Sequence, residues 1–320
     1  MPQAALPYAG RVNDSVPGTT NYGGQAVIEG VMIRGLRSMT VAVRRPDGSI
    51  AEHTERLSTL YTGALRRAPL LRGVVALWEM LTLGTRALTW SAAVATGEVD
   101  ERGEARPLGL WGWTELITTL LVSLAVFFAG PVLLTAWLDD LLPAGWIVVA
   151  LEGLVRVGML LGYIWAIGRT RDIRRVFQYH GAEHMTIHAF EHGALEHGGG
   201  LQVPAVRRFG RAHPRCGTSF LLTVAVVSVF AFVLLGTPPL WWRLLSRLLL
   251  IPPIAAVAYE AIHWAGRHPG QPLVRWLFAG NMALQRLTTR DPDDEQLQVA
   301  ITALERALAE DRSADAPAAL

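Results

Sequence analysis

Four long apolar segments constrain the fold of this chain more than any other feature. They cover residues 116–138, 144–167, 219–240 and 241–264 of the 320-residue sequence. A helix rises about 1.5 Å per residue, so a segment of roughly 20 residues can cross a hydrocarbon layer about 30 Å thick. Short loops join the segments in pairs. The pattern predicts a mainly α membrane protein with about four transmembrane helices in two hairpins.

Arginine placement predicts how these segments cross the membrane. The sequence contains no lysine, and the loops inside the two hairpins offer at most Arg243. Nearly all other arginines lie before the first segment, between the hairpins or after the last segment. Because basic residues are retained on the cytoplasmic side, we expect both termini and the central loop in the cytoplasm. The first 20 residues lack a basic flank followed by an apolar stretch, so we expect no cleaved signal peptide.

Net charge and cysteine content limit the partners and the redox state. The formal charge is +2, from 29 basic and 27 acidic residues. This balance gives no basis for nucleic acid as a partner, so the lipid bilayer is the only partner that the sequence predicts. The single cysteine, Cys216, excludes an intramolecular disulfide and fits a reducing compartment.

Polar stretches between the apolar segments divide the chain into seven parts. We expect, in order, a flexible tail, a cytoplasmic β-containing segment, an interfacial helix with a charged linker, the first hairpin, a cytoplasmic loop rich in histidine, the second hairpin and a cytoplasmic helical tail, over residues 1–20, 21–70, 71–115, 116–167, 168–218, 219–264 and 265–320. Three charges within residues 71–93 favour a helix that lies on the membrane over one that spans it. The fold class is therefore α with a small cytoplasmic α+β portion.

Local patterns indicate how the cytoplasmic parts fold. Alternation on both sides of Pro46-Asp47-Gly48 predicts a small β-hairpin within residues 38–55. The preceding stretch, NYGGQAVIEGVMIRG, predicts a strand with bends at its glycines, in which a buried Glu29 needs a partner such as Arg34. Near the C-terminus, Asp291 or Asp293 can cap a closing amphipathic helix.

The stretch YHGAEHMTIHAFEH, residues 179–192, concentrates the potential chemistry. It places histidines at four-residue steps, which lie on one face of a helix, and Gly193 is a suitable stop for that helix. His180, Glu183 and His184 match the inverted zincin pattern. In that pattern the two imidazoles bind Zn²⁺ and the intervening carboxylate acts as a general base. We therefore predict a divalent metal, with zinc as the first choice.

A second cluster, His213-Pro214-Arg215-Cys216, lies directly before the third apolar segment. Histidine and thiolate are preferred zinc ligands, so His213 or Cys216 can complete the metal site. The alternative is that Cys216 is a small buried residue and His213 a turn residue. Other candidates are two arginines that could stabilise negative charge and three residues around the ligands, namely Arg34, Arg215, Glu29, His188 and Glu191.

Five strings carry a resemblance to a known family: GGQAVIEGVMIRG, LRGVVAL, DIRRVFQYHGAEH, HPRCGTSFL and LQRLTTRDPDDEQ. In this order they resemble the DUF1385 family of bacterial multipass membrane proteins, from about Tyr22 to Leu308. The resemblance implies a location in the bacterial inner membrane and a metal-dependent enzyme of unknown function. It also implies the same candidate residues, without adding a reaction to them.

These observations favour a metal-dependent hydrolase at the cytoplasmic face of the inner membrane, with Glu183 as the catalytic base. The sequence does not identify a substrate, and whether the chain is an enzyme stays open. One alternative is a non-enzymatic scaffold or assembly factor in which the metal closes the central loop. Another is a small transporter that uses Glu152, Arg156 and Glu260 inside the apolar segments.

Overall fold

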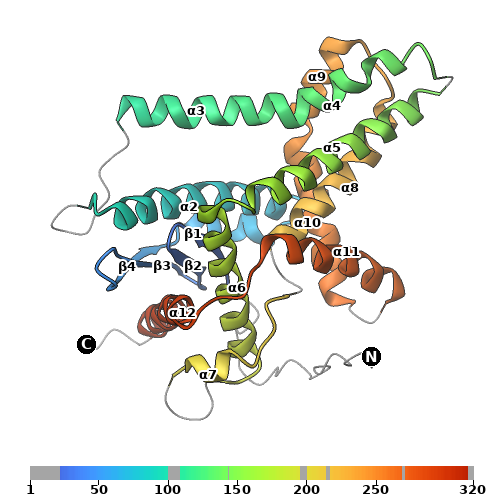
Figure 1. Cartoon of the computed structure of the whole chain (residues 1–320). Helices are drawn as coiled ribbons and strands as arrows, with labels where there is room; N and C mark the ends of the chain where they lie inside the picture. Colours follow the sequence, from blue (N-terminus) through green and yellow to red (C-terminus); the bar gives the residue numbers. More distant parts are fainter. Residues whose placement is uncertain are drawn as a thin grey trace, which may run out of the picture.

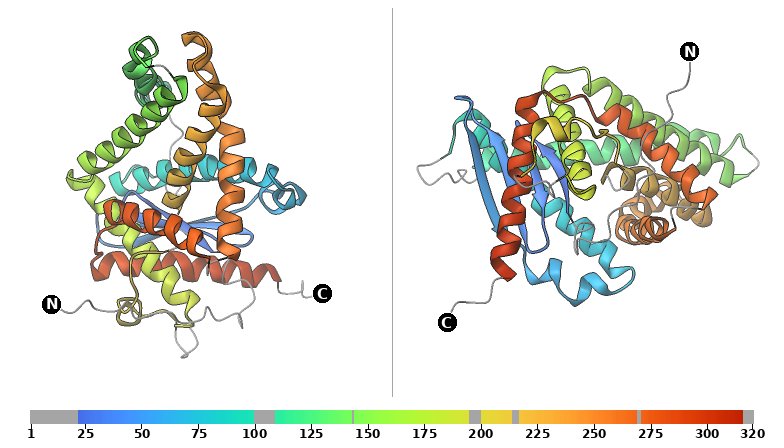
Figure 2. Two further views of the ribbon diagram at one scale, coloured as in Figure 1. Left: turned by 90° about the vertical axis from the view of Figure 1, so that its right-hand side faces the viewer. Right: turned by 90° about the horizontal axis from the view of Figure 1, so that it is seen from below.

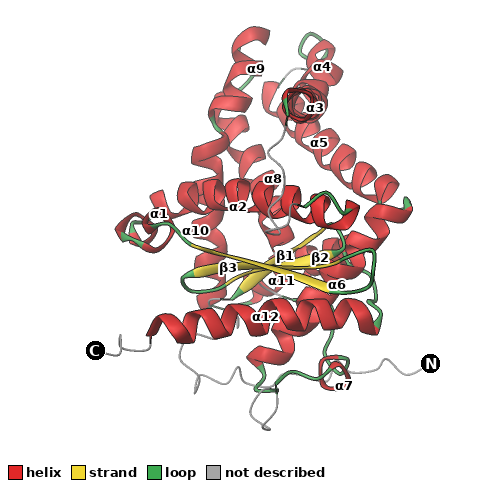
Figure 3. Ribbon diagram, turned by 90° about the vertical axis from the view of Figure 1, so that its left-hand side faces the viewer, coloured by secondary structure: helices red, strands yellow, loops and turns green. Residues whose placement is uncertain are grey.

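The computed structural model describes residues 22–99, 109–142, 144–194, 200–213, 217–268 and 271–315. It is mostly helical, with one antiparallel sheet near the N-terminus (Figure 1). The sheet has the order β1-β2-β3-β4, formed by Gly23–Val27, Gly30–Arg34, Ser38–Arg44 and Ile50–Arg56. Two long helices enclose it, with α2 (Leu71–Thr96) on one face and α12 (Asp294–Asp315) on the other (Figure 3).

The β-containing segment is larger than the sequence indicates. The predicted hairpin is confirmed, since β3 pairs with β4 through a turn in which Gly48 has a φ of 86°. The single bent strand expected before it is wrong. Val27 pairs with Gly30, so Ile28 and Glu29 form a two-residue turn between two separate strands. Glu29 has a φ of 51°, a left-handed conformation that is uncommon for residues other than glycine.

The expected pair of Glu29 and Arg34 does not form. Arg34 instead pairs with Glu79 of α2 at 3.0 Å, on one face of the sheet. Glu29 pairs with Arg175 of α6 (Arg171–Glu191), whose Nε lies 2.5 Å from the carboxylate. The turn between β1 and β2 thus fastens the sheet to the helix that carries the histidines.

Alternation along the strands produces a separate hydrophobic core on each face of the sheet. The core under α2 combines side chains of all four strands with one face of the helix: Val27, Met32, Met39, Val41, Val43, Ala51, Leu83, Ala87, Trp90 and Val94. The core on the opposite face combines strand residues with α6 and α12: Val31, Ile33, Ala42, Tyr179, Ala182, Met185, Leu297, Ile301 and Leu304. Figure 2 shows α12, in red, lying over the face of the sheet. The predicted closing helix is therefore a layer of the core.

Helix α6 runs past the β1 edge of the sheet and ends as predicted. Gly193 follows it with a φ of 74°, the left-handed conformation that stops many helices. A Cβ on Gly181 would lie 2.1 Å from the carbonyl oxygen of Arg290, so glycine permits close contact with the segment before α12. That segment caps α12, because Asp293 accepts a hydrogen bond of 2.8 Å from the backbone N–H of Gln296.

The described chain has two helical stretches that are long and apolar enough to cross a membrane, or three if one bent pair counts as a span. The first, Leu110–Leu138, comprises α3 (Leu110–Leu124), a π segment (Ala125–Ala129), α4 (Gly130–Thr135) and a 3₁₀ turn (Ala136–Leu138), and the second is α5 (Gly145–Ile167). The bent pair is α9 (Leu240–Leu249) with α10 (Ile251–Arg267), which meet at 48°. Pro252 and Pro253, at the start of α10, lack the N–H groups that would continue α9.

The remaining helices are α8 (Gly217–Leu235), which is apolar but shorter than a full span, and α11 (Pro272–Thr288). Short turns of helix at Thr59–Thr62, Ala64–Arg67 and Val203–Val206 form α1, a 3₁₀ turn and α7. The membrane nature of the chain is plausible on these lengths. The described helices supply two or three candidate spans, whereas four are expected from the sequence.

A buried charge cluster joins α5 to α9. Glu152 is fully buried and pairs at 2.8 Å with Arg156, which follows it by four residues on α5. Two further partners come from α9: Arg243 at 3.1 Å and Arg247 at 2.9 Å. Removing one member of such a cluster leaves an uncompensated buried charge, which is strongly destabilising.

We expect Leu304→Ala to lower the stability of the chain markedly. Leu304 is fully buried between α12 and the sheet, and a Leu→Ala change in a packed core costs about 2–5 kcal/mol of unfolding free energy. Tryptophan fluorescence during heating of the purified full chain measures the effect. Glu295→Ala, on the same helix with a side chain that is 74% exposed, is the matched control. Equal melting temperatures for the two variants would contradict this account of α12.

Candidate metal centre

Three side chains predicted as a metal site converge on one face of α6. One potential ligand atom from each of His180, Glu183 and His184 lies within 4.8 Å of the other two. Glu183 and His184 are buried, whereas His180 is half-buried. The Nε2 atom of His184 lies 3.6 Å from Oε2 of Glu183. Ligand atoms of a tetrahedral zinc ion stand about 3.4 Å apart, so small side-chain movements would bring the three into coordinating positions.

Hydrogen bonds to backbone carbonyls orient two of these imidazoles. Nδ1 of His180 lies 2.9 Å from the carbonyl oxygen of Thr288, and Nδ1 of His184 lies 2.6 Å from that of Arg211. A carbonyl oxygen can only accept, so each Nδ1 carries the hydrogen and each Nε2 carries the lone pair. Metal-binding histidines are commonly oriented by a contact of this kind. The donor set therefore fits a divalent metal.

Glu183 lies against the backbone of β1. A Cβ on Gly24 would stand 3.0 Å from Cγ of Glu183, so the absence of a side chain at Gly24 allows the approach. Burial raises the pKa of Glu183 to about 8; Glu191 adds to the rise and a hydrogen bond from the Gly24 backbone opposes it. Within the described chain, the one basic side chain within 4 Å of its carboxylate is His184. A bound cation would lower this pKa again.

The two imidazoles favour their neutral form. Burial, followed by the proximity of His180, lowers the pKa of His184 to about 2. Burial also lowers the pKa of His180. Neutral imidazole is the form that binds metals, so neither histidine has to lose a proton near neutral pH before it can act as a ligand.

His213 lies beside the three, held by contacts of its own. The side-chain amide of Gln285 accepts a hydrogen bond from the backbone N–H of His213 at 2.9 Å and donates one to the carbonyl of His213 at 2.8 Å. Its Nε2 lies 3.0 Å from the Glu191 carboxylate, and its ring centre lies 5.9 Å from that of His184. If Nε2 donates to Glu191, the lone pair of His213 is on Nδ1, which is then its ligand atom. The ring of His188 stands 5.4 Å from that of His213.

Two predicted site residues that the structure describes, Arg34 and Glu29, do not join this cluster. Arg34 points to the opposite face of the sheet, where it binds Glu79. Glu29 contacts α6 nearer to the start of the helix. Its carboxylate binds Arg175 and lies 3.3 Å from the hydroxyl of Tyr179. Arg215 and Cys216 lie outside the described residues. The centre brought together is therefore His180, Glu183, His184, His213 and Glu191, with His188 beside it.

Several groups that shape the centre were not predicted from the sequence. The carbonyl groups of Thr288 and Arg211 leave no mark in the side-chain pattern. Gln285 is a single amide within a helix, and nothing in its spacing connects it to His213. Gly24 had a detectable signal, the pair Gly23-Gly24 at the start of an apolar strand, where a glycine often marks close approach of another element.

Comparisons with known proteins extend over most of the chain. A family model described as a protein of unknown function (DUF1385) matches residues 68–310. The chain is 35% identical over 295 residues to an uncharacterized protein, YqhQ, of Bacillus subtilis (strain 168), an alignment that covers 88% of this chain and 90% of that protein. No solved structure matches the chain.

We expect Gly24→Ala to disturb the centre and Gly23→Ala to leave it intact. The new Cβ at residue 24 would meet the Met32 carbonyl oxygen at 2.4 Å and Glu183 at 3.0 Å, whereas a Cβ at residue 23 meets nothing within 4 Å. Overpacking of this kind costs about 1–3 kcal/mol. Melting temperature and metal content of the purified variants measure the effect. Similar values for both variants would show that Glu183 does not depend on this contact.

Proposed function

Since the chain belongs to the DUF1385 family, whose function is unknown, we propose a function from its own residues: a metal-dependent hydrolase at the cytoplasmic face of the bacterial inner membrane. The observation that carries the proposal is the pair of imidazoles on α6 whose Nδ1 atoms are bound to carbonyl oxygens, next to the buried carboxylate of Glu183. Two neutral nitrogen donors and an adjacent carboxylate are the components that metal-assisted hydrolysis requires.

Each residue of the centre has a role in this proposal. His180 and His184 would hold the metal through Nε2, and His213 or Cys216 would supply a further ligand. Glu183 takes the proton of the attacking water and returns it to the leaving group. When bound, the metal supplies a Lewis acid that polarises the water and the substrate oxygen. Arg215 is the candidate for stabilising negative charge, whereas the placement of Arg34 removes it from this role.

Zinc is the metal that fits these donors best. Imidazole nitrogen, carboxylate oxygen and the thiolate that Cys216 could supply, three residues after His213 in the sequence, are ligand types of protein zinc sites. Magnesium and calcium take mainly oxygen ligands. Glu191 contributes indirectly by fixing the orientation of His213 at 3.0 Å. Carboxylates in such outer positions raise the basicity of the histidine that they contact.

The placement at the membrane is part of the same proposal. The four spans would be the α3–α4 stretch, α5, α8 and the bent α9–α10 pair, with both termini in the cytoplasm. Large apolar side chains cover the outward face of these helices and of α2, where Trp78, Leu81 and Leu88 are exposed. Such a surface suits lipid. Because α6 begins four residues after α5 ends, the metal centre would lie close to the membrane surface.

One observation favours the second candidate, a metal-stapled scaffold without catalysis. Glu183 and His184 are only 4% and 2% exposed, and closed metal sites are usually structural. In this function the metal would join α6 to the segment before α8. Substrate would have no access, and Glu183 would serve as a ligand or a hydrogen-bond acceptor.

We expect the purified full chain to contain about one zinc ion per molecule and His184→Ala to lose it. His192→Ala is the matched control, because that ring bonds to the carbonyl of His188 on the same helix at 2.8 Å and lies away from the trio. Elemental analysis of the two variants and the unmodified chain measures the difference. Equal metal content in both variants, or none in the unmodified chain, would remove the basis for a metal centre.

Glu183→Gln separates the two candidate functions. For the hydrolase, the variant keeps its metal and loses at least 100-fold in turnover of any ester, amide or phosphoester substrate found by screening the unmodified chain, because general bases contribute about 10²–10⁴-fold. For the scaffold, the melting temperature falls when metal is removed by a chelator, and no substrate in the screen is turned over. Full activity in Glu183→Gln would contradict the role of this residue as the base.

A further inference from the structure

Strand β4 is an edge of the sheet with unpaired backbone groups. In its pairing with β3, the N–H of Leu57 donates to Arg37 and the carbonyl of Ser49 accepts from Arg45. Both N–H and C=O of one residue in an antiparallel strand point to the same neighbour, and successive residues alternate. The odd-numbered residues of β4 therefore face β3, and Ile50, Glu52, Thr54 and Arg56 direct their backbone groups away from the sheet.

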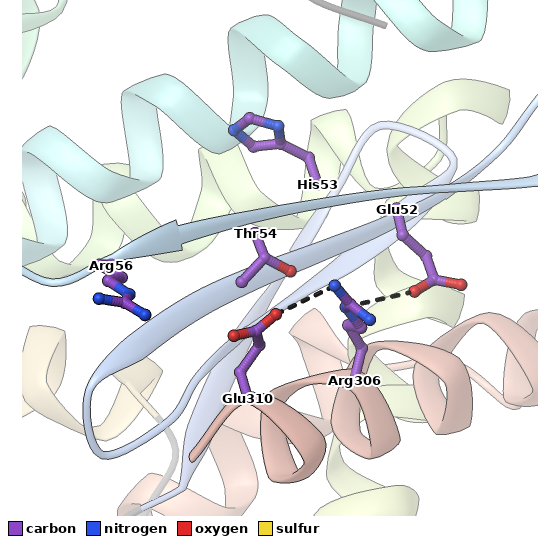
Figure 4. A pocket seen from close by; sticks show the side chains of 6 residues that line it. All are labelled: Glu52, His53, Thr54, Arg56, Arg306 and Glu310. Atoms are coloured by element: carbon purple, nitrogen blue, oxygen red, sulfur yellow. Dashed lines mark hydrogen bonds and ion pairs between the residues drawn. The ribbon is translucent and has the colours of Figure 1, made fainter. Parts of the chain in front are cut away.

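An open polar groove follows this edge, between β4 and α12 (Figure 4). Its lining consists of Glu52, His53, Thr54, Arg56, Arg306 and Glu310. Figure 4 shows Arg306 between the two glutamates, 4.0 Å from Glu52 and 3.0 Å from Glu310. Glu52 and Arg56 are exposed. An exposed edge strand is a template for another strand, so its side chains decide what can pair with it.

The order of side chains along this edge is complementary to itself. Residues 52–56 read Glu-His-Thr-Glu-Arg. When two copies run antiparallel with Thr54 opposite Thr54, Glu52 faces Arg56 of the other copy and His53 faces Glu55. We propose that β4 pairs with β4 of a second copy in this register, so that two sheets join into one continuous sheet in a symmetric dimer.

The backbone supports the same register. Thr54, Glu52 and Arg56 all direct N–H and C=O outward, so in the register centred on Thr54 they exchange hydrogen bonds with the partner strand. A register centred on His53 also matches outward-facing groups, because Glu52 then lies opposite Thr54. That register is disfavoured by its side chains, since it sets Glu55 against Ala51 and Arg56 against Ile50, with no ion pair. A parallel arrangement in register would place Glu52 against Glu52, which repels.

The position of the sheet relative to the apolar helices allows both copies to share one membrane. In Figure 3 the sheet is seen on edge, with α8 and α9 rising from the side that α2 covers. The two-fold axis of such an antiparallel pair is perpendicular to the sheet. It therefore runs along the direction in which α8 and α9 rise, so these helices extend from the same side in both copies. This step rests on the proposed membrane placement, whereas the charge and backbone arguments do not.

Charge reversal tests the pairing, and mixing the reversed variants shows whether each of them is folded. In a homodimer of Arg56→Glu, positions 52 and 56 of both copies are acidic and repel one another. In a homodimer of Glu52→Arg the same four positions are basic. Each variant alone is therefore expected to be monomeric. Mixed together, the two variants restore Glu–Arg at both positions and should co-purify when only one carries a tag. The chain with both changes, E52R and R56E, should dimerise again. Co-purification also shows that each single variant is folded.

Cross-linking in intact membranes tests the register itself. Thr54→Cys places two thiols on the two-fold axis, and a short bifunctional maleimide should convert most of the chain into a species of twice its mass. The unmodified chain, with Cys216, and Asp47→Cys in the exposed turn are the controls, and both should stay uncross-linked. An uncross-linked Thr54→Cys chain, an adduct of another mass, or single variants that dimerise as well as the unmodified chain would each overturn the proposal.

Discussion

The candidate centre depends on hydrogen bonds from the imidazoles of α6 to two backbone carbonyls that lie far apart in the sequence. His184 binds the carbonyl of Arg211, just before α8, and His180 binds that of Thr288, at the end of α11. These carbonyls bracket the whole second apolar hairpin. The geometry of the histidines therefore follows the position of the apolar helices, whereas Arg175 and Glu183 of the same helix are positioned by the sheet through Glu29 and Gly24. The candidate centre lies where these two halves meet.

Local patterns predicted the elements whose signals are local. The histidine helix, its stop at Gly193 and the β3–β4 hairpin were all foreseen, because periodicity and turn residues are short-range features. The β1–β2 hairpin was missed because its turn, Ile28-Glu29, contains none of the residues that favour tight turns. The convergence of His180, Glu183 and His184 was predictable from helical spacing. The contacts of His213 with Glu191 and Gln285 were not, since they join segments that are 22 and 72 residues apart.

The apolar half shows a similar limit. Glu152 and Arg156 are close in the sequence and pair along one helix, but Arg243 and Arg247 reach Glu152 from 91 and 95 residues away. Arg243 was interpreted as a loop residue, and it is 1% exposed. Because α9 and α10 are separated by a bend, the fourth apolar segment does not form one straight helix. A hydropathy pattern reports length and composition, and it cannot show where a buried ion pair and a proline pair divide a segment.

The role of α12 as a core layer has a consequence for the order in which the protein matures. This helix covers one face of the sheet and contacts α6, yet its residues 294–315 follow all the apolar helices in the sequence. The ribosome synthesises a chain from its N-terminus, so the apolar helices emerge before the residues that complete the core. During translation the sheet and the histidine helix are exposed on that side. In the proposed function, metal would therefore load only after α12 has been translated and has packed on the sheet.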